Sequence, residues 1–292
     1  MSDATRAPLR IGLTQWHATD EPLANLVKAE NAVARSAAQG AQIVVLPENG
    51  LMLSTGPKMR DEAIDASGEA VARLAEAARQ NNVAVIMGGT KFRHEGRISN
   101  RALVFDCTGA IVGSYDKIHL FDARVTGHSF EASKVEESGS EPVIVEFGGW
   151  KLGLTICYDV RFPELYRHLA LSGAEVLLVP SAFTRITGRA HWETLLRARA
   201  IENGCYVVAP ATVTPPGVEG DAFETFGHAL VVDPWGAILE DLGEQDASVA
   251  VATLEFDEVA KARHTLPVLE QVRVDAYRRE VRYVHVVDGG KK

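Results

Sequence analysis

The sequence is poor in cysteine, in basic residues and in long apolar runs. Its three cysteines, Cys107, Cys157 and Cys205, lack CxxC spacing, which argues against a disulfide framework and a zinc knuckle. Lys and Arg number 30 against 39 Asp and Glu, and the net charge of −9 argues against a general nucleic-acid binder. No apolar run approaches the roughly 20 residues that a membrane-spanning helix needs. We therefore expect neither a nucleic-acid nor a membrane partner.

Several common functional motifs are missing as well. No GxSxG, GxGxxG or P-loop pattern occurs, so a serine hydrolase, a dinucleotide site and a nucleotide site lack support. His119, His191 and His228 lack HxH or HxxxH spacing, so we expect no metal and no cofactor. The opening MSDATRAPLRIGL contains no apolar core of a secretory signal, which favours a reducing cytoplasm with free thiols.

Strand-like and helical patterns alternate along both halves of the chain. Residues 9–16 and 42–46 are short apolar runs, whereas residues 22–39 show apolar side chains at helical spacing. No linker or repeat divides the chain. The pattern predicts one α/β domain with a mixed sheet or two and helices outside. We place a flexible tail at residues 1–8, the domain at 9–277 and a C-terminal arm or tail at 278–292.

Cys157 lies in the stretch KLGLTICYDVRFPELY, residues 151–166. Residues 151–156 predict a buried strand, and Pro163 and Glu164 suit the first turn of a helix. Cys157 therefore follows a strand at the sheet edge, near backbone N–H groups that favour a thiolate. A free cysteine beside a strand is more often an apolar filler, so both interpretations stay open.

Two further polar residues follow apolar strands in the same way. Glu48 comes after QIVVL, and Lys117 comes after IVGSYD. Ligands of α/β sheets bind beyond strand ends, so these residues and Cys157 are candidates to converge. A thiol attacks carbon, a carboxylate takes its proton and an ammonium stabilises an oxyanion. An ordinary salt bridge between Glu48 and Lys117 is the alternative.

Three sequence motifs, LPENG, YDKIHLFD and GLTICYDVRFPEL, occur in this order and resemble those of the carbon–nitrogen hydrolase family, or nitrilase superfamily. The resemblance runs from Ile11 to about Tyr277. It implies a four-layer αββα sandwich, a catalytic triad of Glu48, Lys117 and Cys157, and a homodimer or higher homo-oligomer that pairs through outer helices. It also implies a thioester acyl-enzyme on the cysteine that releases ammonia and a carboxylic acid.

The segments SAF, RARAIE and VDPWG resemble the amidase branch of the family, which includes deaminated glutathione amidase and ω-amidase. This resemblance implies a small carboxamide substrate, either deaminated-glutathione-like or an ω-amide of an α-keto acid. An N-carbamoyl amino acid amidohydrolase or a nitrilase on the same triad is the alternative. A non-catalytic interaction protein on the same fold is a more distant one.

One departure from the family pattern concerns an additional glutamate after the lysine motif. The family's Glu often precedes Ser directly, whereas this chain reads Ser-Phe-Glu-Ala-Ser at 129–133, which places Glu131 one residue early. Glu131 is a possible additional catalytic residue. It lies in a polar stretch to about residue 141 that predicts a functional or mobile loop.

Other residues are expected to support the site. Asp159 is expected to shape a turn, Arg161 and Glu164 are expected to pair behind the cysteine, and Cys107 and Cys205 are expected to be inert core thiols. Residues expected to line the substrate pocket or support it are Tyr158, Arg161, Glu164, Phe183, Thr184 and His191. Candidate partners for a substrate carboxylate are Arg124, Arg185 and Arg189.

Overall fold

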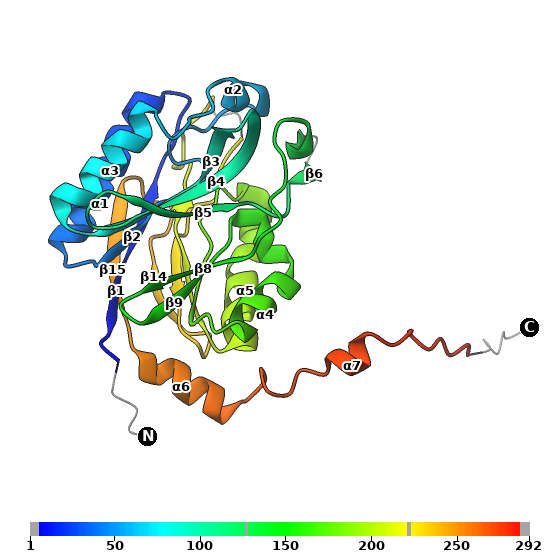
Figure 1. Ribbon diagram of the computed structural model, residues 1–292. Coiled ribbons are helices and arrows are strands. Elements are labelled where there is room, and N and C mark those ends of the chain that lie inside the picture. Colours follow the sequence, from blue (N-terminus) through cyan, green and yellow to red (C-terminus); the bar gives the residue numbers. More distant parts are fainter. Residues whose placement is uncertain (1–5, 126–127, 221–222, 287–292) are drawn as a thin grey trace, which may run out of the picture.

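Two β-sheets lie face to face with helices on both outer sides (Figure 1). The computed structural model describes residues 6–125, 128–220 and 223–286. The first sheet has the order β12–β1–β2–β3–β4–β5 with β15 antiparallel to β1, and the second has the order β14–β13–β11–β10–β9–β8. Helices α1 (Pro22–Ala38) and α3 (Glu69–Asn81) cover the first sheet, and α4 (Pro163–Leu171) and α5 (Arg185–Asn203) cover the second. The predicted four-layer αββα sandwich is confirmed.

The strands range from two residues in β12 to 11 residues in β3. The first sheet contains β1 (Leu9–Trp16), β2 (Ile43–Val45), β3 (Ala84–His94), β4 (Arg97–Phe105), β5 (Ile111–Asp116), β12 (Ala211–Thr212) and β15 (Ser248–Leu254). The second contains β8 (Val143–Phe147), β9 (Trp150–Leu154), β10 (Val176–Leu178), β11 (Tyr206–Ala209), β13 (Leu230–Val232) and β14 (Ile238–Asp241).

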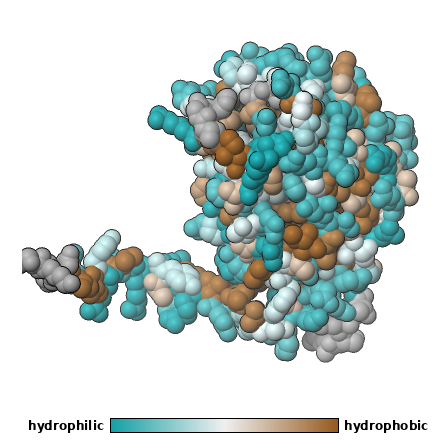
Figure 2. Space-filling view, turned by 180° about the vertical axis from the view of Figure 1, so that it is seen from behind, coloured by the Kyte–Doolittle hydropathy of each residue, from teal (hydrophilic) through white to brown (hydrophobic). Residues whose placement is uncertain are grey.

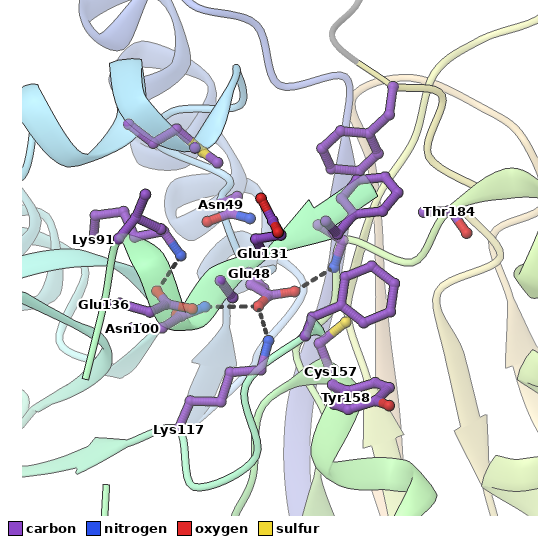
Figure 3. A pocket seen from close by; sticks show the side chains of 18 of the residues that line it. Glu48, Asn49, Lys91, Asn100, Lys117, Glu131, Glu136, Cys157, Tyr158 and Thr184 are labelled. Atoms are coloured by element: carbon purple, nitrogen blue, oxygen red, sulfur yellow. Dashed lines mark hydrogen bonds and ion pairs between the residues drawn. The ribbon is translucent and has the colours of Figure 1, made fainter. Parts of the chain in front are cut away.

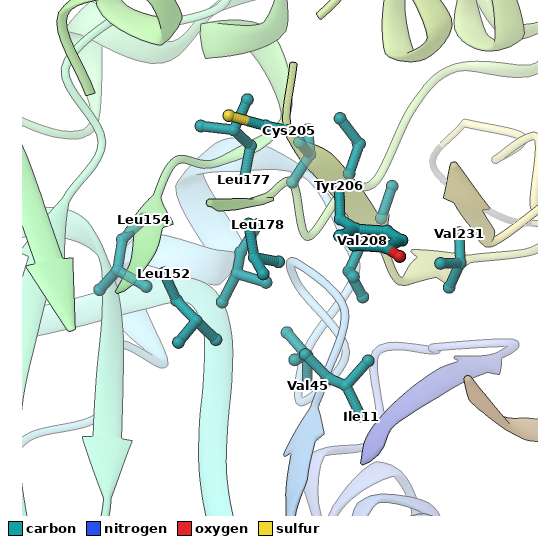
Figure 4. Packing of buried hydrophobic residues seen from close by; sticks show 14 of the residues in the cluster. Ile11, Val45, Leu152, Leu154, Leu177, Leu178, Cys205, Tyr206, Val208 and Val231 are labelled. Carbon is teal, nitrogen blue, oxygen red and sulfur yellow. The ribbon is translucent and has the colours of Figure 1, made fainter. Parts of the chain in front are cut away.

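The alternation of side chains along β2 divides the core. Ile43 and Val45 point into the cluster between the sheets. There Val45 faces the second sheet, which contributes Leu152 and Leu178 (Figure 4). Val44 points the other way and joins a second cluster with residues of α1 and α3. Successive side chains of a strand face opposite sides, so this apolar run fills two layers at once. The register of β2 therefore also determines where the next residues, up to Glu48, emerge.

Gly88 and Gly89 create space at the sheet edge where the functional residues gather. A Cβ atom at Gly88 would lie 2.4 Å from the Leu46 carbonyl oxygen, and one at Gly89 would lie 2.2 Å from Asn100 Oδ1. The β3–β4 register shifts at this point, between Met87 and Thr90. Only glycine permits this close approach of backbone to neighbouring groups.

The structure corrects the expectation of a loop from residue 122 to about residue 141. Strands β6 (Asp122–Val125) and β7 (His128–Glu131) form a separate hairpin, followed by the 3-10 helix η1 (Ala132–Lys134). Ring contacts hold this hairpin, since Phe130 lies 5.0 Å from Phe121 and 5.4 Å from Phe223, centroid to centroid. Phe223 is distant in sequence from Phe130, so local patterns could not predict this contact. A short helix, α2 (Gly56–Asp61), was also missed.

The expectation for the two cysteines outside the triad is half right. Cys205 is buried, and its Sγ lies 3.2 Å from the Ala174 carbonyl oxygen. Cys107 is exposed, because the turn between β4 and β5 carries it into solvent. The prediction of a core thiol at Cys107 is therefore wrong.

The end of the described chain leaves the sandwich. After α6 (Phe256–Thr265) and the short α7 (Val274–Tyr277), residues 278–286 extend away from the body (Figures 1 and 2). They carry exposed apolar side chains, among them Tyr283, Val284 and Val286. Among the helices in the described ranges, none is long and apolar enough to span a bilayer.

Candidate active site

A cavity of about 410 Å³ opens at the edge where β2, β5 and β9 end. Glu48, Lys117 and Cys157 all line it (Figure 3). The chain therefore brings together three side chains that are far apart in sequence, as expected from their positions beyond strand ends. The volume lies within the range of sites for small molecules.

The Glu48 carboxylate is held by three donors. Its Oε1 accepts from Lys117 Nζ at 2.7 Å and from Asn100 Nδ2 at 2.8 Å, and its Oε2 accepts from the Ala182 backbone N–H at 2.9 Å. Glu48 is buried, so these bonds offset the loss of water around its charge. The carboxylate is thus fixed in one orientation facing the cavity.

Lys117 is positioned by its backbone as well as by its side chain. Its N–H donates to the Asn100 carbonyl oxygen at 2.9 Å, and its own carbonyl oxygen accepts from Gly139 N–H at 2.8 Å. The ammonium is as buried as the carboxylate that it meets. Asn100 therefore contacts both members of the ion pair, through its side chain to Glu48 and through its backbone to Lys117.

Cys157 sits on a tight elbow after β9. It begins the 3-10 helix η2 (Cys157–Arg161) with a φ of +47°, and its N–H donates to the Pro180 carbonyl oxygen at 3.0 Å. A positive φ is costly for a residue with a side chain, and such strain gathers at functional sites. The elbow turns the thiol out of the strand and into the cavity.

Asp159 organises this elbow. Its buried carboxylate accepts from the Ile156 backbone N–H at 2.9 Å, the Tyr115 hydroxyl at 2.7 Å and the His119 backbone N–H at 3.0 Å. The expected turn-forming role is therefore met by contacts to β5 and to the segment after Lys117. Asp159 therefore anchors both the Cys157 elbow and the segment that follows Lys117.

The charge state of the site follows from burial and from the ion pair. Burial alone would raise the pKa of Glu48, but the Lys117 charge and hydrogen bond hold that pKa below its ordinary value. Burial alone would lower the pKa of Lys117, but the nearby negative charges, Glu48 first among them, raise it well above its ordinary value. The resting pair is therefore a carboxylate and an ammonium.

The thiol is protonated at rest. Burial, followed by the Glu48 charge, raises the pKa of Cys157 well above that of a free cysteine, and Lys117 offsets this only in part. The expectation that the elbow favours a thiolate is thus wrong, because desolvation outweighs the nearby backbone dipoles. A thiol beside an ionised carboxylate needs that carboxylate as a base before it can attack.

Most of the expected supporting residues surround the cavity. Tyr158, Arg161, Phe183 and Thr184 line it, as does Glu131. The Glu131 side chain is half exposed, at 51%, and pairs with Lys134 at 2.7 Å. Within the described ranges, no hydrogen bond joins Glu131 to the triad.

Arg161 departs from the expected pairing with Glu164. Its Nη1 lies 3.3 Å from His191 Nδ1, and its guanidinium lies over Phe183, 5.1 Å from the ring centroid. Glu164 is exposed on α4 and contributes nothing to the cavity wall. Within the described chain, Arg161 has no carboxylate at ion-pair distance. Arg161 is thus a cation in the cavity wall that no acidic side chain of the described residues neutralises.

The three arginines expected to receive a substrate carboxylate lie elsewhere. Arg185 is bound by Glu224 and Glu244, each at 2.9 Å. Neither it nor Arg124 nor Arg189, all three within the described ranges, lines the cavity.

Sequence reasoning missed four residues of the site. They are Asn49, Lys91, Asn100 and Glu136, all buried in the cavity wall. Lys91 and Asn100 lie at buried positions of β3 and β4, but both strands carry several other polar residues, so no local pattern singled these two out. Searching the described residues for three or more His, Cys, Asp or Glu side chains arranged to hold a metal ion finds no such group.

Comparison with known proteins gives the same family as the motifs. Residues 10–264 match the family described as carbon-nitrogen hydrolase. A deaminated glutathione amidase of Synechocystis is 39% identical over 252 residues, which is 84% of this chain and 91% of the relative. The omega-amidase NIT2 of Mus musculus is 35% identical over 269 residues, 92% of this chain and 96% of the relative.

A solved structure adds chemical detail. A mutant of the amidase from Nesterenkonia sp. AN1 is 27% identical, has a TM-score of 0.77, and aligns over 95% of this chain and 98% of that one. In that structure the acetamide moiety of fluoroacetamide is covalently attached to the active-site cysteine. This chain has a cysteine on a strained elbow in its cavity, its relatives are named amidases, and the Nesterenkonia amidase carries its adduct on an active-site cysteine. The chain therefore belongs to the carbon–nitrogen hydrolase family and is a thiol amidase.

Proposed function

We propose that Glu48, Lys117 and Cys157 hydrolyse the carboxamide of a small carboxylic acid. The observation that carries this proposal is the buried 2.7 Å ion pair of Glu48 and Lys117 in the same cavity as the Cys157 thiol. A base, a cation and a nucleophile in one enclosed site are what amide hydrolysis requires. An ordinary salt bridge would not need a thiol on a strained elbow beside it.

The reaction proceeds in two halves. Glu48 takes the Cys157 proton as Sγ attacks the amide carbon, and Lys117 with the Tyr158 backbone N–H stabilises the oxyanion. Glu48 then protonates the leaving ammonia, which yields a thioester. Water deprotonated by Glu48 attacks the thioester, and the carboxylic acid leaves as the thiol is restored. The general base contributes about 10²–10⁴ in rate and one oxyanion donor about 10²–10³.

The position of Arg161 supports the proposal that the substrate carries a carboxylate. It lines the cavity next to Cys157, stays without an acidic partner among the described side chains, and is held against Phe183. A guanidinium binds a carboxylate through two parallel hydrogen bonds, so it selects an acid over a neutral amide. The substrates named for the relatives, deaminated glutathione and ω-amides, favour the same class.

Ammonia release tests the substrate. Purified protein is supplied with α-ketoglutaramate, deaminated glutathione, an N-carbamoyl amino acid and a plain nitrile. The proposal expects turnover of one of the first two and a matching acyl mass on Cys157. A Cys157→Ala variant must be inactive, whereas Cys205→Ala, a buried thiol outside the cavity, must stay active. Near-full activity of Cys157→Ala would overturn the proposal, and exclusive turnover of the ureido compound or the nitrile would replace the substrate class.

The remaining expectations extend this proposal. Exposed apolar residues on α4 and α5, Leu171, Ile186 and Ile201, support pairing of two copies through the outer helices. A molar mass of one chain in light scattering would contradict it. We also propose that residues 9–277 act as one domain. The tail expected at 1–8 and the arm expected at 278–292 lie partly outside the described residues. The free thiol suits the cytoplasm. Limited proteolysis and localisation of the tagged protein test these two points.

A further inference from the structure

The cavity wall contains a second buried ion pair that the proposed reaction does not use. Lys91 of β3 contacts Glu136, which follows η1, through Nζ and Oε2 (Figure 3). Their side chains are only 8% and 1% exposed. Both line the cavity together with the triad. Burying two charges is costly, and an apolar pair of similar size usually gives equal or greater stability. The pair therefore needs a reason beyond stability.

Strand geometry ties this pair to the triad. Lys91 and Asn100 are direct partners in the β3–β4 register, so their side chains project from the same face of the sheet. Asn100 in turn donates to Glu48 Oε1 and accepts from the Lys117 backbone N–H. The backbone next to Glu136 is held against β4, because the N–H of the following residue, Glu137, donates to the Ile98 carbonyl oxygen at 2.7 Å. Lys91 and Glu136 are thus fixed next to the residues that hold Glu48 and Lys117.

The signs of the four charges are complementary. The positive charge of Lys91 acts on the Glu48 carboxylate, and the negative charge of Glu136 acts on the Lys117 ammonium. In a buried site such interactions are screened little, so each charge favours the ionised form of its opposite neighbour. The other charged side chains of the cavity are Glu131, Lys134 and Arg161, and the first two largely neutralise each other.

We propose that Lys91 and Glu136 are positioning residues that maintain the reactive charge state of the triad, Lys91 by keeping Glu48 an available base and Glu136 by keeping Lys117 a cation. This inference rests on the proposed catalytic roles of Glu48 and Lys117. It assigns the second buried carboxylate of the site to Glu136. Glu131, the residue singled out from the sequence, is half exposed and bound to Lys134 instead.

The test compares charge with packing. Lys91→Met removes the charge, Lys91→Arg keeps it, and the double variant Lys91→Glu, Glu136→Lys keeps the pair but reverses its field. The measurement is the rate of Cys157 alkylation by iodoacetamide and kcat/KM for the amide, from about pH 4 to pH 8, where circular dichroism shows folded protein. Thermal unfolding of each variant gives the structural effect separately.

The proposal expects the acid limb of both profiles to move up by about 0.5–1 pH unit in Lys91→Met, at least as far in the reversed pair, and little in Lys91→Arg. A reversed pair that regains both the wild-type unfolding temperature and the wild-type profile would show a purely structural role and overturn the inference. If the reversed pair does not fold, the contrast between Met and Arg at position 91 decides. Absence of any acyl-enzyme on wild-type Cys157 would instead refute the proposed function.

Discussion

Asn100 Nδ2 lies 2.8 Å from Glu48 Oε1 and donates a hydrogen bond to it, inside the cavity wall. The same residue accepts a hydrogen bond from Lys117 through its backbone. One residue in the middle of β4 therefore contacts both the Glu48 carboxylate and the Lys117 backbone. Neither bond follows from the order of residues along the chain, since Asn100 is 52 positions from Glu48.

Replacing Asn100 with alanine should lower kcat/KM by about 10- to 100-fold, because a hydrogen bond to a charged group contributes about 1.5–3 kcal/mol. Asn203→Ala serves as the control. Asn203 is also buried, and its side chain donates to the Arg199 carbonyl oxygen at 2.9 Å, away from the cavity. Steady-state kinetics of the two variants should differ by at least about tenfold. Equal activity would mean that Asn100 has no part in holding Glu48.

Replacing Asp159 with asparagine should destabilise the protein by about 1–3 kcal/mol, since an amide cannot accept from the hydroxyl and the two N–H donors and also meet the His119 ring, whose Nδ1 lies 2.7 Å from the carboxylate. Tyr115→Phe removes only one of these donors and should cost about 1 kcal/mol. Urea unfolding followed by fluorescence measures both. If Asp159→Asn is as stable as wild type, the elbow does not depend on this anchor.

Replacing Arg161 with methionine should raise KM for an acidic amide by about tenfold or more and leave turnover of a neutral amide such as propionamide nearly unchanged. Methionine keeps much of the packing against Phe183 while it removes the charge. Arg189→Met is the matched control, because Arg189 is exposed on α5 and lies outside the cavity wall. A loss of the same size with both substrates would indicate a structural role for Arg161.

The stability contributed by the Glu48–Lys117 pair should depend on pH in a defined way. Glu48 has a lowered pKa, so its contribution is present above the unfolded value of about 4.3 and disappears as the pH falls through the folded value. Lys117 has a raised pKa, so its contribution is present below the unfolded value of about 10.4 and disappears as the pH rises through the folded value.

The measurement is the free energy of unfolding of wild type minus that of the double variant Glu48→Gln, Lys117→Met. Titrating groups outside the cavity are shared by the two proteins and cancel in the difference. We expect the difference to be constant between about pH 5 and pH 10, and to fall against wild type below about pH 4. A difference that stays flat through the acid range would contradict an ionised Glu48 in the resting protein.

Local sequence determined much of this protein. Apolar runs and helical spacing predicted the main strands and helices, because each pattern matches the period of its element. The three sequence motifs predicted the family and the αββα sandwich. They also predicted that Glu48, Lys117 and Cys157 form the catalytic triad. The glycine pair at 88–89 was visible in the sequence, but the backbone approach that requires it was not.

Tertiary structure decided what surrounds those three residues. Register between β3 and β4 placed Lys91 beside Asn100, and a loop brought Glu136 to Lys91. The same folding left Glu131 half exposed. Burial, which no local pattern specifies, kept the Cys157 thiol protonated and reversed the expectation from its elbow. Local sequence sets backbone preference and side-chain chemistry, whereas the charge state and the partners of a group depend on which distant groups replace water around it.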